Sequence, residues 1–114
     1  MTDVLERVKT YQQFIGGEFV DAADGRTADV INPANDQVIA NVPASSSEDV
    51  DRAVRAAATA FETWKKTTPQ DRSLLMLKVA DALEANAERL GRLESANAGK
   101  PVGAAIDEIG VCAD

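Results

Sequence analysis

The 114-residue sequence predicts a mixed α+β chain, in which two short β-hairpins precede four helices. Up to Pro43, short apolar stretches alternate with glycine, proline and asparagine turn signals, which is typical of strands. Beyond it, apolar residues recur every three or four positions, which is typical of amphipathic helices. We therefore expect a hairpin region over 11–43 and a helical region over 44–114. Residues 1–10 are mostly polar and predict a frayed lead-in or a short helix.

Both hairpins within 11–42 are recognised by turn residues between apolar strands. In the first, strands at 14–15 and 19–20 flank Gly16–Gly17, and glycine supplies the positive φ that two-residue hairpin turns need. In the second, strands at 30–31 and 38–42 flank a longer Asn-Pro-Ala-Asn-Asp loop. Asparagine, proline and aspartate are common loop residues for distinct conformational reasons. Two antiparallel pairs are therefore expected.

The first helix is predicted near 47–64. Ser46 followed by Asp49 has capping-box spacing, with aspartate in place of the usual glutamate. Lys65–Lys66 lies at the other end, where cations complement the helix dipole. The helix carries one apolar stripe, so one side is expected to cover another part of the protein. This stripe contains Val50, Ala53, Val54, Ala57, Phe61 and Trp64.

The second and third helices are predicted near 69–84 and 87–98. Thr68 is the expected N-cap of the second, followed by proline in the first turn. This helix is apolar around most of its circumference, so we expect neighbours on more than one side. Asn86 is the expected cap of the third helix, and Gly99 is well placed to end it. Its predicted inward residues are Leu90, Leu93 and Ala96.

The fourth helix is predicted near 102–114, beginning after Pro101. Its apolar residues keep helical spacing until the last positions, and the sequence stops at Asp114 without a cap or a polar tail. An amphipathic helix that ends in mid-pattern suggests a truncated sequence, although a native C-terminus can also end in this way. The small, alanine-rich side chains predict a core of marginal stability at this length.

Composition excludes several classes of function. The net charge of −7 disfavours a nucleic-acid binder, because phosphates would repel the chain. The 45% apolar content argues against disorder. The longest apolar runs are too short to span a bilayer, and the first residues lack the apolar region of a secretory signal. The single cysteine, Cys112, cannot form an internal disulfide and fits a reducing compartment, so we expect a cytoplasmic protein.

Few residues carry recognisable chemistry. Without histidine, imidazole catalysis and the usual zinc sites are excluded within this chain. Cys112 lies among apolar residues late in a helix, so a small buried or interface role is favoured over a nucleophile. The adjacent carboxylates Asp107 and Glu108 point about 100° apart on a helix and do not form an acid/base pair. Gly99-Lys100-Pro101 could suggest a phosphate site, but a helix–turn–helix corner is favoured.

An ordered series of motifs resembles the opening of NAD(P)-dependent aldehyde dehydrogenases. The resemblance runs from about Tyr11 to the end of the sequence. Within the family, the motifs are most similar to those of the aminoaldehyde branch, meaning γ-aminobutyraldehyde or betaine aldehyde dehydrogenases. Each motif alone is weak, whereas the ordered set is specific. The motifs lie at 14–20, 31–34, 49–54, 60–64, 71–72 and 93–101.

The resemblance implies a place within a larger α/β enzyme. Full members are roughly four times longer, and the helical region 44–114 would be an incomplete part of their Rossmann-like NAD-binding domain. They oxidise an aldehyde by thiolate attack, hydride transfer to NAD(P)⁺ and thioester hydrolysis. Their nucleophilic cysteine, general-base glutamate and oxyanion-stabilising asparagine match no position here. We therefore assign no catalytic or cofactor residue, and we expect this chain alone to bind neither NAD nor NADP.

The resemblance implies one further site. Many members hold a structural monovalent cation between a backbone carbonyl before the Asn-Pro pair and a carboxylate after Gly-Lys-Pro. Ile31 matches the first ligand. Glu108 is the best match for the second, with Asp107 as a competitor, and oxygen ligands suit hard cations. The remaining ligand would come from sequence that is absent here.

Three interpretations remain open. The chain could be the N-terminal piece of an aldehyde dehydrogenase, inactive by itself, with the aldehyde substrate belonging to the full-length enzyme. It could instead be a free-standing acidic module that self-associates or binds a related subunit. It could also be a decayed remnant without catalysis. The unfinished last helix and the ordered motifs favour the first interpretation, with no nucleic-acid or membrane partner.

Overall fold

The predicted order of elements is confirmed. This computed structural model describes residues 8–114. All the strands precede all the helices, and the four helix boundaries agree with the predicted ones to within one residue. The elements are β1 (Lys9–Thr10), β2 (Gln13–Ile15), β3 (Glu18–Val20), β4 (Thr27–Ile31), β5 (Val38–Pro43), α1 (Ser47–Trp64), α2 (Pro69–Ala85), α3 (Ala87–Ala98) and α4 (Val102–Ala113).

Both predicted hairpins form. β2 and β3 are antiparallel around Gly16–Gly17, whose φ values are +64° and +87°. Phe14 lies opposite Phe19, with ring centroids 5.0 Å apart. β4 and β5 are also antiparallel, with an irregularity between Val30 and Ile31. Turn chemistry therefore predicted both pairings correctly.

The expectation of a polar lead-in or short helix is wrong for its last two residues. Lys9 and Thr10 form β1, which pairs in parallel with β5 and gives a three-stranded sheet in the order β1-β5-β4. The pairing continues through the N–H of Tyr11, which donates to the carbonyl of Asn41 at 2.9 Å. β1 is defined by backbone hydrogen bonds, and the pattern of its side chains does not predict a strand. Val8 has no regular secondary structure, and the rest of the expected lead-in, residues 1–7, lies outside the described part.

The capping predictions hold for two helices and fail for one. Ser46 and Asp49 form a reciprocal capping box, and Thr68 Oγ1 accepts from the N–H of Asp71. Asn86, however, makes no side-chain cap; its amide donates to the carbonyl of Ala82 instead. α2 and α3 are separated by this one residue, so its side chain bonds backward to the carbonyl end of α2. Gly99 ends α3 in the left-handed conformation, as expected.

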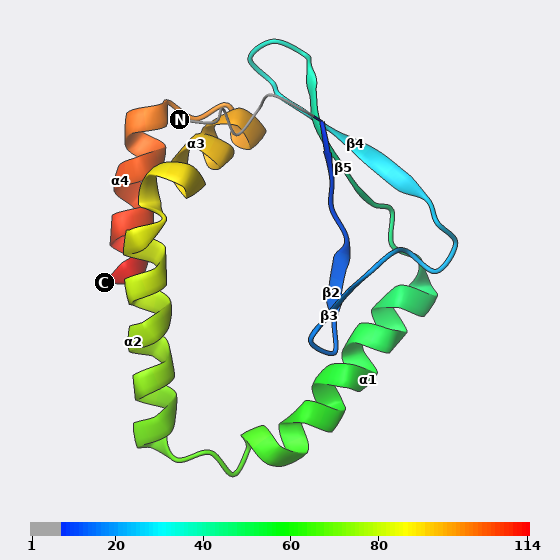
Figure 1. Cartoon of the computed structure of the whole chain (residues 1–114), viewed down its shortest axis with the longest axis vertical. Coiled ribbons are helices and arrows are strands. Elements are labelled where there is room, and N and C mark those ends of the chain that lie inside the picture. Colours follow the sequence, from blue (N-terminus) through cyan, green and yellow to red (C-terminus); the bar gives the residue numbers. More distant parts are fainter. Residues whose placement is uncertain (1–7) are drawn as a thin grey trace.

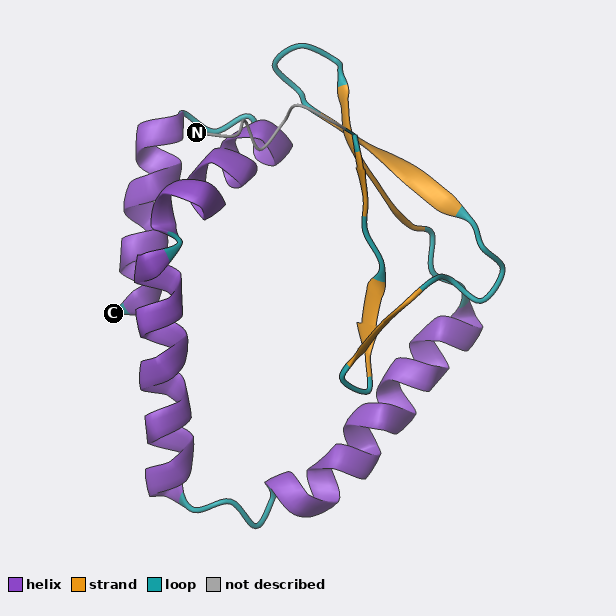
Figure 2. Cartoon of the chain, in the orientation of Figure 1, coloured by secondary structure: helices purple, strands orange, loops and turns teal. Residues whose placement is uncertain are grey.

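The elements enclose an open shape (Figures 1 and 2). α1 and α2 diverge from their connecting loop, with the strands beside α1 and the α3–α4 pair beside the far end of α2. The radius of gyration is 17.0 Å, against about 13 Å for a compact domain of this length. The three extents are 47, 38 and 21 Å. The chain is therefore much less compact than an autonomous domain.

The buried core is small, as the composition predicted. Its apolar members over residues 8–114 are all alanines: Ala22, Ala40, Ala96 and Ala105. The large apolar side chains of α1 and α2 are mostly exposed, including Val54 at 61% and Leu77 at 60%. The predicted stripe of α1 therefore does not cover the strands; α1 meets them through Asp49 and Ala56 instead. Within residues 8–114, most of the circumference of α2 likewise has no neighbouring element.

Asp49 is the residue that joins α1 to the strand region. Its side chain is buried, with 1% relative exposure, and accepts from the N–H of Ala23 at 3.0 Å and from the N–H of Ser46 at 2.9 Å. These donors, the Ser46 N–H first, lower the pKa of the Asp49 carboxyl to about 2. A buried carboxylate thus holds two segments that share little apolar contact.

Candidate functional site

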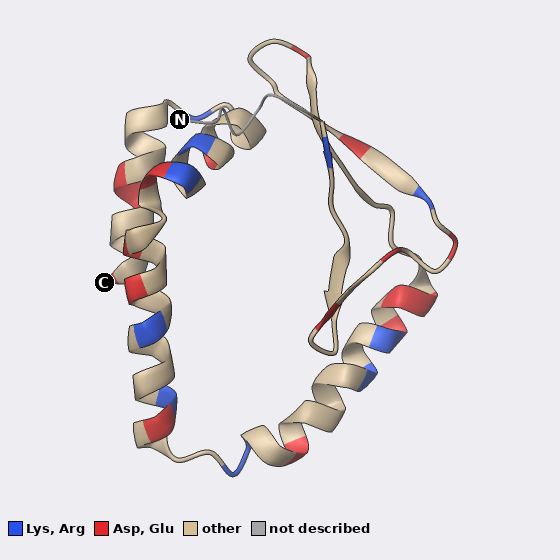
Figure 3. Cartoon of the chain, viewed as in Figure 1, with Lys and Arg blue, Asp and Glu red and all other residues tan. Residues whose placement is uncertain are grey.

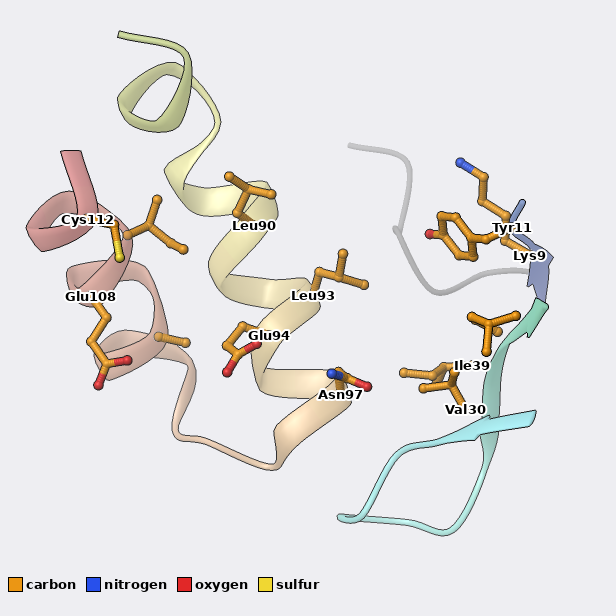
Figure 4. Close-up of a pocket in the computed structure, with 14 residues that line it drawn as sticks. Lys9, Tyr11, Val30, Ile39, Leu90, Leu93, Glu94, Asn97, Glu108 and Cys112 are labelled. Carbon is orange, nitrogen blue, oxygen red and sulfur yellow. The ribbon is translucent and has the colours of Figure 1, made fainter. Parts of the chain in front are cut away.

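A pocket of about 470 Å³ lies between the β1-β5-β4 sheet and the α3–α4 pair (Figure 4). Its lining is mainly apolar on both walls. In the close-up, Leu93 and Asn97 of α3 point toward Val30 and Ile39 of the strands. The lining residues are Lys9, Tyr11, Val30, Ile39, Ala40, Val42, Leu90, Leu93, Glu94, Asn97, Ala105, Glu108, Ile109 and Cys112.

The helical wall is built on one close helix–helix contact. Gly91 of α3 lies against Ile106 of α4, and a Cβ added at Gly91 would be 2.7 Å from the backbone N and Cα of Ile106. Ala96 and Ala105 are buried beside this contact. Small residues allow the two helix backbones to approach, so α3 and α4 present Leu90, Leu93 and Ile109 together to the pocket.

The corner between α3 and α4 connects this wall to the strands. Gly99 adopts φ +76°, and Ser95 Oγ donates to the carbonyl of Lys100 at 2.7 Å. A Cβ at Gly99 would be 2.9 Å from Cγ of Pro33, so the corner lies directly against the β4–β5 loop. The helix–turn–helix interpretation of Gly99-Lys100-Pro101 is thus confirmed.

Charged residues make up a minority of the pocket lining, namely Lys9, Glu94 and Glu108. The Lys100 ammonium is ion-paired with the Glu108 carboxylate, which raises the pKa of Lys100. Around the rest of the molecule, acidic and basic residues are interspersed along α1, α2 and α3 (Figure 3). The pocket is therefore suited to apolar groups, with Glu94 and Asn97 as nearby polar partners.

The two residues expected to hold a cation occupy different environments. Ile31 is the last residue of β4 and is half-exposed, while Glu108 of α4 is engaged by Lys100. Over residues 8–114, no group of three carboxylate, cysteine or histidine side chains is close enough to hold a metal ion. A cation at Glu108 would have to compete with an ammonium. The cation site remains a prediction.

Cys112 is exposed and lines the pocket. The thiol is not buried within this chain, so of the two roles favoured for it, buried or interface, the interface role stays a prediction. The sequence supplies no histidine to activate the thiol. The largely apolar lining of the pocket can therefore bind apolar groups. In the described part of the chain, no helix has both the length and the apolarity to cross a membrane.

The pocket itself was not anticipated from the sequence. It depends on β1 joining the sheet and on the sheet facing α3–α4, which are long-range features. The spacing of Leu90, Leu93 and Ile109 indicated an inward apolar face, but it did not indicate that this face would lie opposite the sheet.

Comparisons with known proteins give one consistent result. The family model described as "Aldehyde dehydrogenase family" matches residues 19–114. The chain is 47% identical over 93 residues to a mitochondrial aldehyde dehydrogenase of Leishmania tarentolae, covering 82% of this chain and 19% of that one. It is 41% identical over 102 residues to malonate-semialdehyde dehydrogenase 2 of Geobacillus kaustophilus, covering 90% of this chain and 21% of the relative.

A solved structure shows the same similarity in three dimensions. The NAD-dependent aldehyde dehydrogenase of Sinorhizobium meliloti superposes with a TM-score of 0.91 at 42% identity. The match covers 96% of this chain and 22% of that chain. The chain thus spans about a fifth of the length of the relatives that it matches.

Proposed function

The chain belongs to the aldehyde dehydrogenase family, and from this premise we propose that it is the N-terminal structural segment of an enzyme that oxidises an aldehyde to a carboxylate with NAD(P)⁺. By itself the segment would be inactive. Its role would be to support the cofactor-binding and catalytic parts of the fold, which contain the reacting groups.

One observation carries this proposal. The chain keeps the shape of the corresponding segment of a complete dehydrogenase, yet it leaves its large apolar side chains exposed. A free-standing domain buries such side chains, because each Leu or Phe gains roughly 1.5–3 kcal/mol from full burial. A segment embedded in a larger enzyme would bury them against the remainder of the fold.

The finer assignments are also proposals. The texture of the motifs favours an aminoaldehyde as substrate, whereas one matched relative is named for malonate semialdehyde. An aminoaldehyde, a simple aldehyde and malonate semialdehyde are therefore the substrates to compare. NAD or NADP would be the cofactor of the complete enzyme. A monovalent cation would bind near Ile31 and Glu108, and the enzyme would work in the cytoplasm.

A chimera tests the proposal. The matching 22% of the Sinorhizobium meliloti enzyme is replaced by this chain, and NADH production from the three aldehydes is followed by absorbance. We expect the chimera to retain activity, because the two segments share their fold and 42% of their residues. Failure of the chimera to fold or to oxidise any aldehyde, while the parent enzyme remains active, would contradict the proposal.

The matched control for the chimera changes the close contact between α3 and α4 at Gly91. In Gly91→Leu, the added side chain would overlap the Ile106 backbone. We expect this chimera to lose most of its activity, and Gly110→Ala, where the new Cβ meets no atom within 4 Å, to keep it.

A further inference from the structure

The corner between α1 and α2 contains one side-chain contact that bridges the connecting loop. Arg72 of α2 donates from Nη2 to the carbonyl oxygen of Trp64, the last residue of α1, at 3.0 Å. The same guanidinium lies over the Trp64 ring, with Cζ 5.2 Å from the ring centroid. In the described chain, α1 and α2 diverge from the loop without extended packing of one helix on the other (Figure 1). The contact therefore joins two helices that have little else to hold them together.

The carbonyl that Arg72 contacts belongs to the unsatisfied end of α1. The last carbonyls of a helix have no donor within the helix. The N–H of Thr67 donates to the Trp64 carbonyl at 3.0 Å, and Arg72 supplies a second donor. A cation at this position also complements the negative end of the helix dipole. Arg72 thus caps the C-terminus of α1, although it belongs to the next helix.

The two lysines expected to complement the dipole of α1 lie just beyond its last turn. The ammonium of Lys65 is paired with Glu62 at 2.6 Å. Basic residues occur both in this loop and in the first turn of α2 (Figure 3). Among them, Arg72 is the one whose side chain donates to a terminal carbonyl of α1 in the described chain.

The position of Arg72 is unfavourable for its own helix. It is the fourth residue of α2, and a cation in the first turn opposes the dipole of that helix. Its Nε is also buried and has no hydrogen-bond partner among residues 8–114. Residues that break a local rule are found where a larger structural or functional requirement exceeds the local cost. Here the requirement is the end of α1.

The angle at this corner affects two larger parts of the chain. α1 is joined to the strand region through Asp49, and α2 continues through Asn86 into the α3–α4 pair. One wall of the pocket belongs to the sheet and the other to α3–α4. These two parts meet again where Gly99 lies against Pro33. The α1–α2 corner is therefore one of two points that determine how the walls face each other.

We propose that Arg72 is a positioning residue, which fixes the angle between α1 and α2 by holding both the carbonyl and the ring of Trp64. This inference concerns the chain itself and does not depend on the proposed function. A guanidinium suits the role because it is planar and donates in its plane while its face stacks on an indole. A lysine would supply the charge without this combination.

A distance measurement between α1 and α2 tests the proposal. Nitroxide labels are attached at Ala53→Cys in α1 and Glu84→Cys in α2, both exposed positions, in a Cys112→Ala background. The labelled chain is diluted with unlabelled chain, so that double electron–electron resonance detects only distances within one molecule. With Arg72 present, we expect one narrow distance distribution. In Arg72→Gln the loop dihedrals become a free hinge, and the distribution should become about twice as wide.

A matched control separates the contact from the charge. Lys66→Gln removes the same charge beside the same end of α1 and should leave the distribution unchanged. Arg72→Lys keeps the charge but loses the planar stacking, so its distribution should also widen. Trp64 is the only tryptophan, so its fluorescence reports the contact directly. Acrylamide should quench this fluorescence more strongly in Arg72→Gln than in Lys66→Gln.

Each remaining outcome is decisive. An unchanged distribution in Arg72→Gln would overturn the proposal, as would an equal widening in Lys66→Gln. If circular dichroism shows that Arg72→Gln has lost its helices, Arg72→Lys decides the question. A helical Arg72→Lys chain with a distribution as narrow as that of the parent would then overturn the proposal, and a wider one would support it.

Discussion

Gly91→Ala is a sharp test of the packing that forms the helical wall of the pocket. An alanine Cβ at this position would lie 2.5 Å from Cγ1 of Ile106 and 2.7 Å from its backbone N and Cα. The side chain could rotate away, but the backbone could move only if α3 and α4 separated. Overpacking of this kind costs about 1–3 kcal/mol.

Helix propensity acts in the opposite direction. Alanine stabilises a helix interior by about 0.8–1.0 kcal/mol relative to glycine, so propensity alone would make Gly91→Ala favourable. Because the obstacle is backbone, we expect the steric cost to exceed this gain, with a net loss of up to about 2 kcal/mol. Gly110→Ala in α4, where the added Cβ has open space, should show only the gain.

Amide hydrogen exchange in α3 and α4 measures both effects locally, without requiring a cooperative transition of the whole chain. A loss of up to about 2 kcal/mol corresponds to exchange up to about 30 times faster in Gly91→Ala. In Gly110→Ala, exchange should become slower. If Gly91→Ala also slowed exchange, the close contact between α3 and α4 would be refuted.

Two further predictions concern Asp49 and Cys112. The pKa of Asp49 is lowered from its usual 3.8 to about 2, so its carboxylate stabilises the fold above pH 3.8, and this stabilisation is lost as the pH falls through 3.8 toward 2. Circular dichroism between pH 5 and 2 should show this loss, whereas Asp49→Asn should be less stable at pH 7 and change less in that window. The purified chain should produce no NADH from aldehydes, and activity that disappears in Cys112→Ala would contradict the assignment of no catalytic residue.

Local signals in the sequence predicted most of the elements. The Gly16–Gly17 turn, the Ser46–Asp49 capping box and Thr68–Pro69 each act over a few residues, so their effect can be recognised without the rest of the fold. The predicted side-chain cap at Asn86 does not form. Asn86 is the single residue between two helices, and its amide donates to the carbonyl of Ala82 at the end of α2 instead.

Long-range features could not be predicted in the same way. β1 forms through backbone bonds to a strand about thirty residues away, and its side chains carry no strand pattern. The stripe of α1 correctly indicated an apolar face, but not that this face would stay exposed in the chain. The pocket depends on β1 and on the position of the sheet opposite α3 and α4, which are both long-range features. The family motifs indicated a larger fold that would cover these apolar faces, which the periodicity of the sequence alone does not indicate.

The central claim is that this chain cannot complete its own hydrophobic core. Thermal unfolding of the isolated chain, followed by circular dichroism with sedimentation velocity and hydrophobic-dye binding on the same sample, tests it most directly. We expect a broad, weakly cooperative transition with bound dye, or self-association that increases with concentration. A monomer at high concentration that melts sharply and binds no dye would contradict the claim.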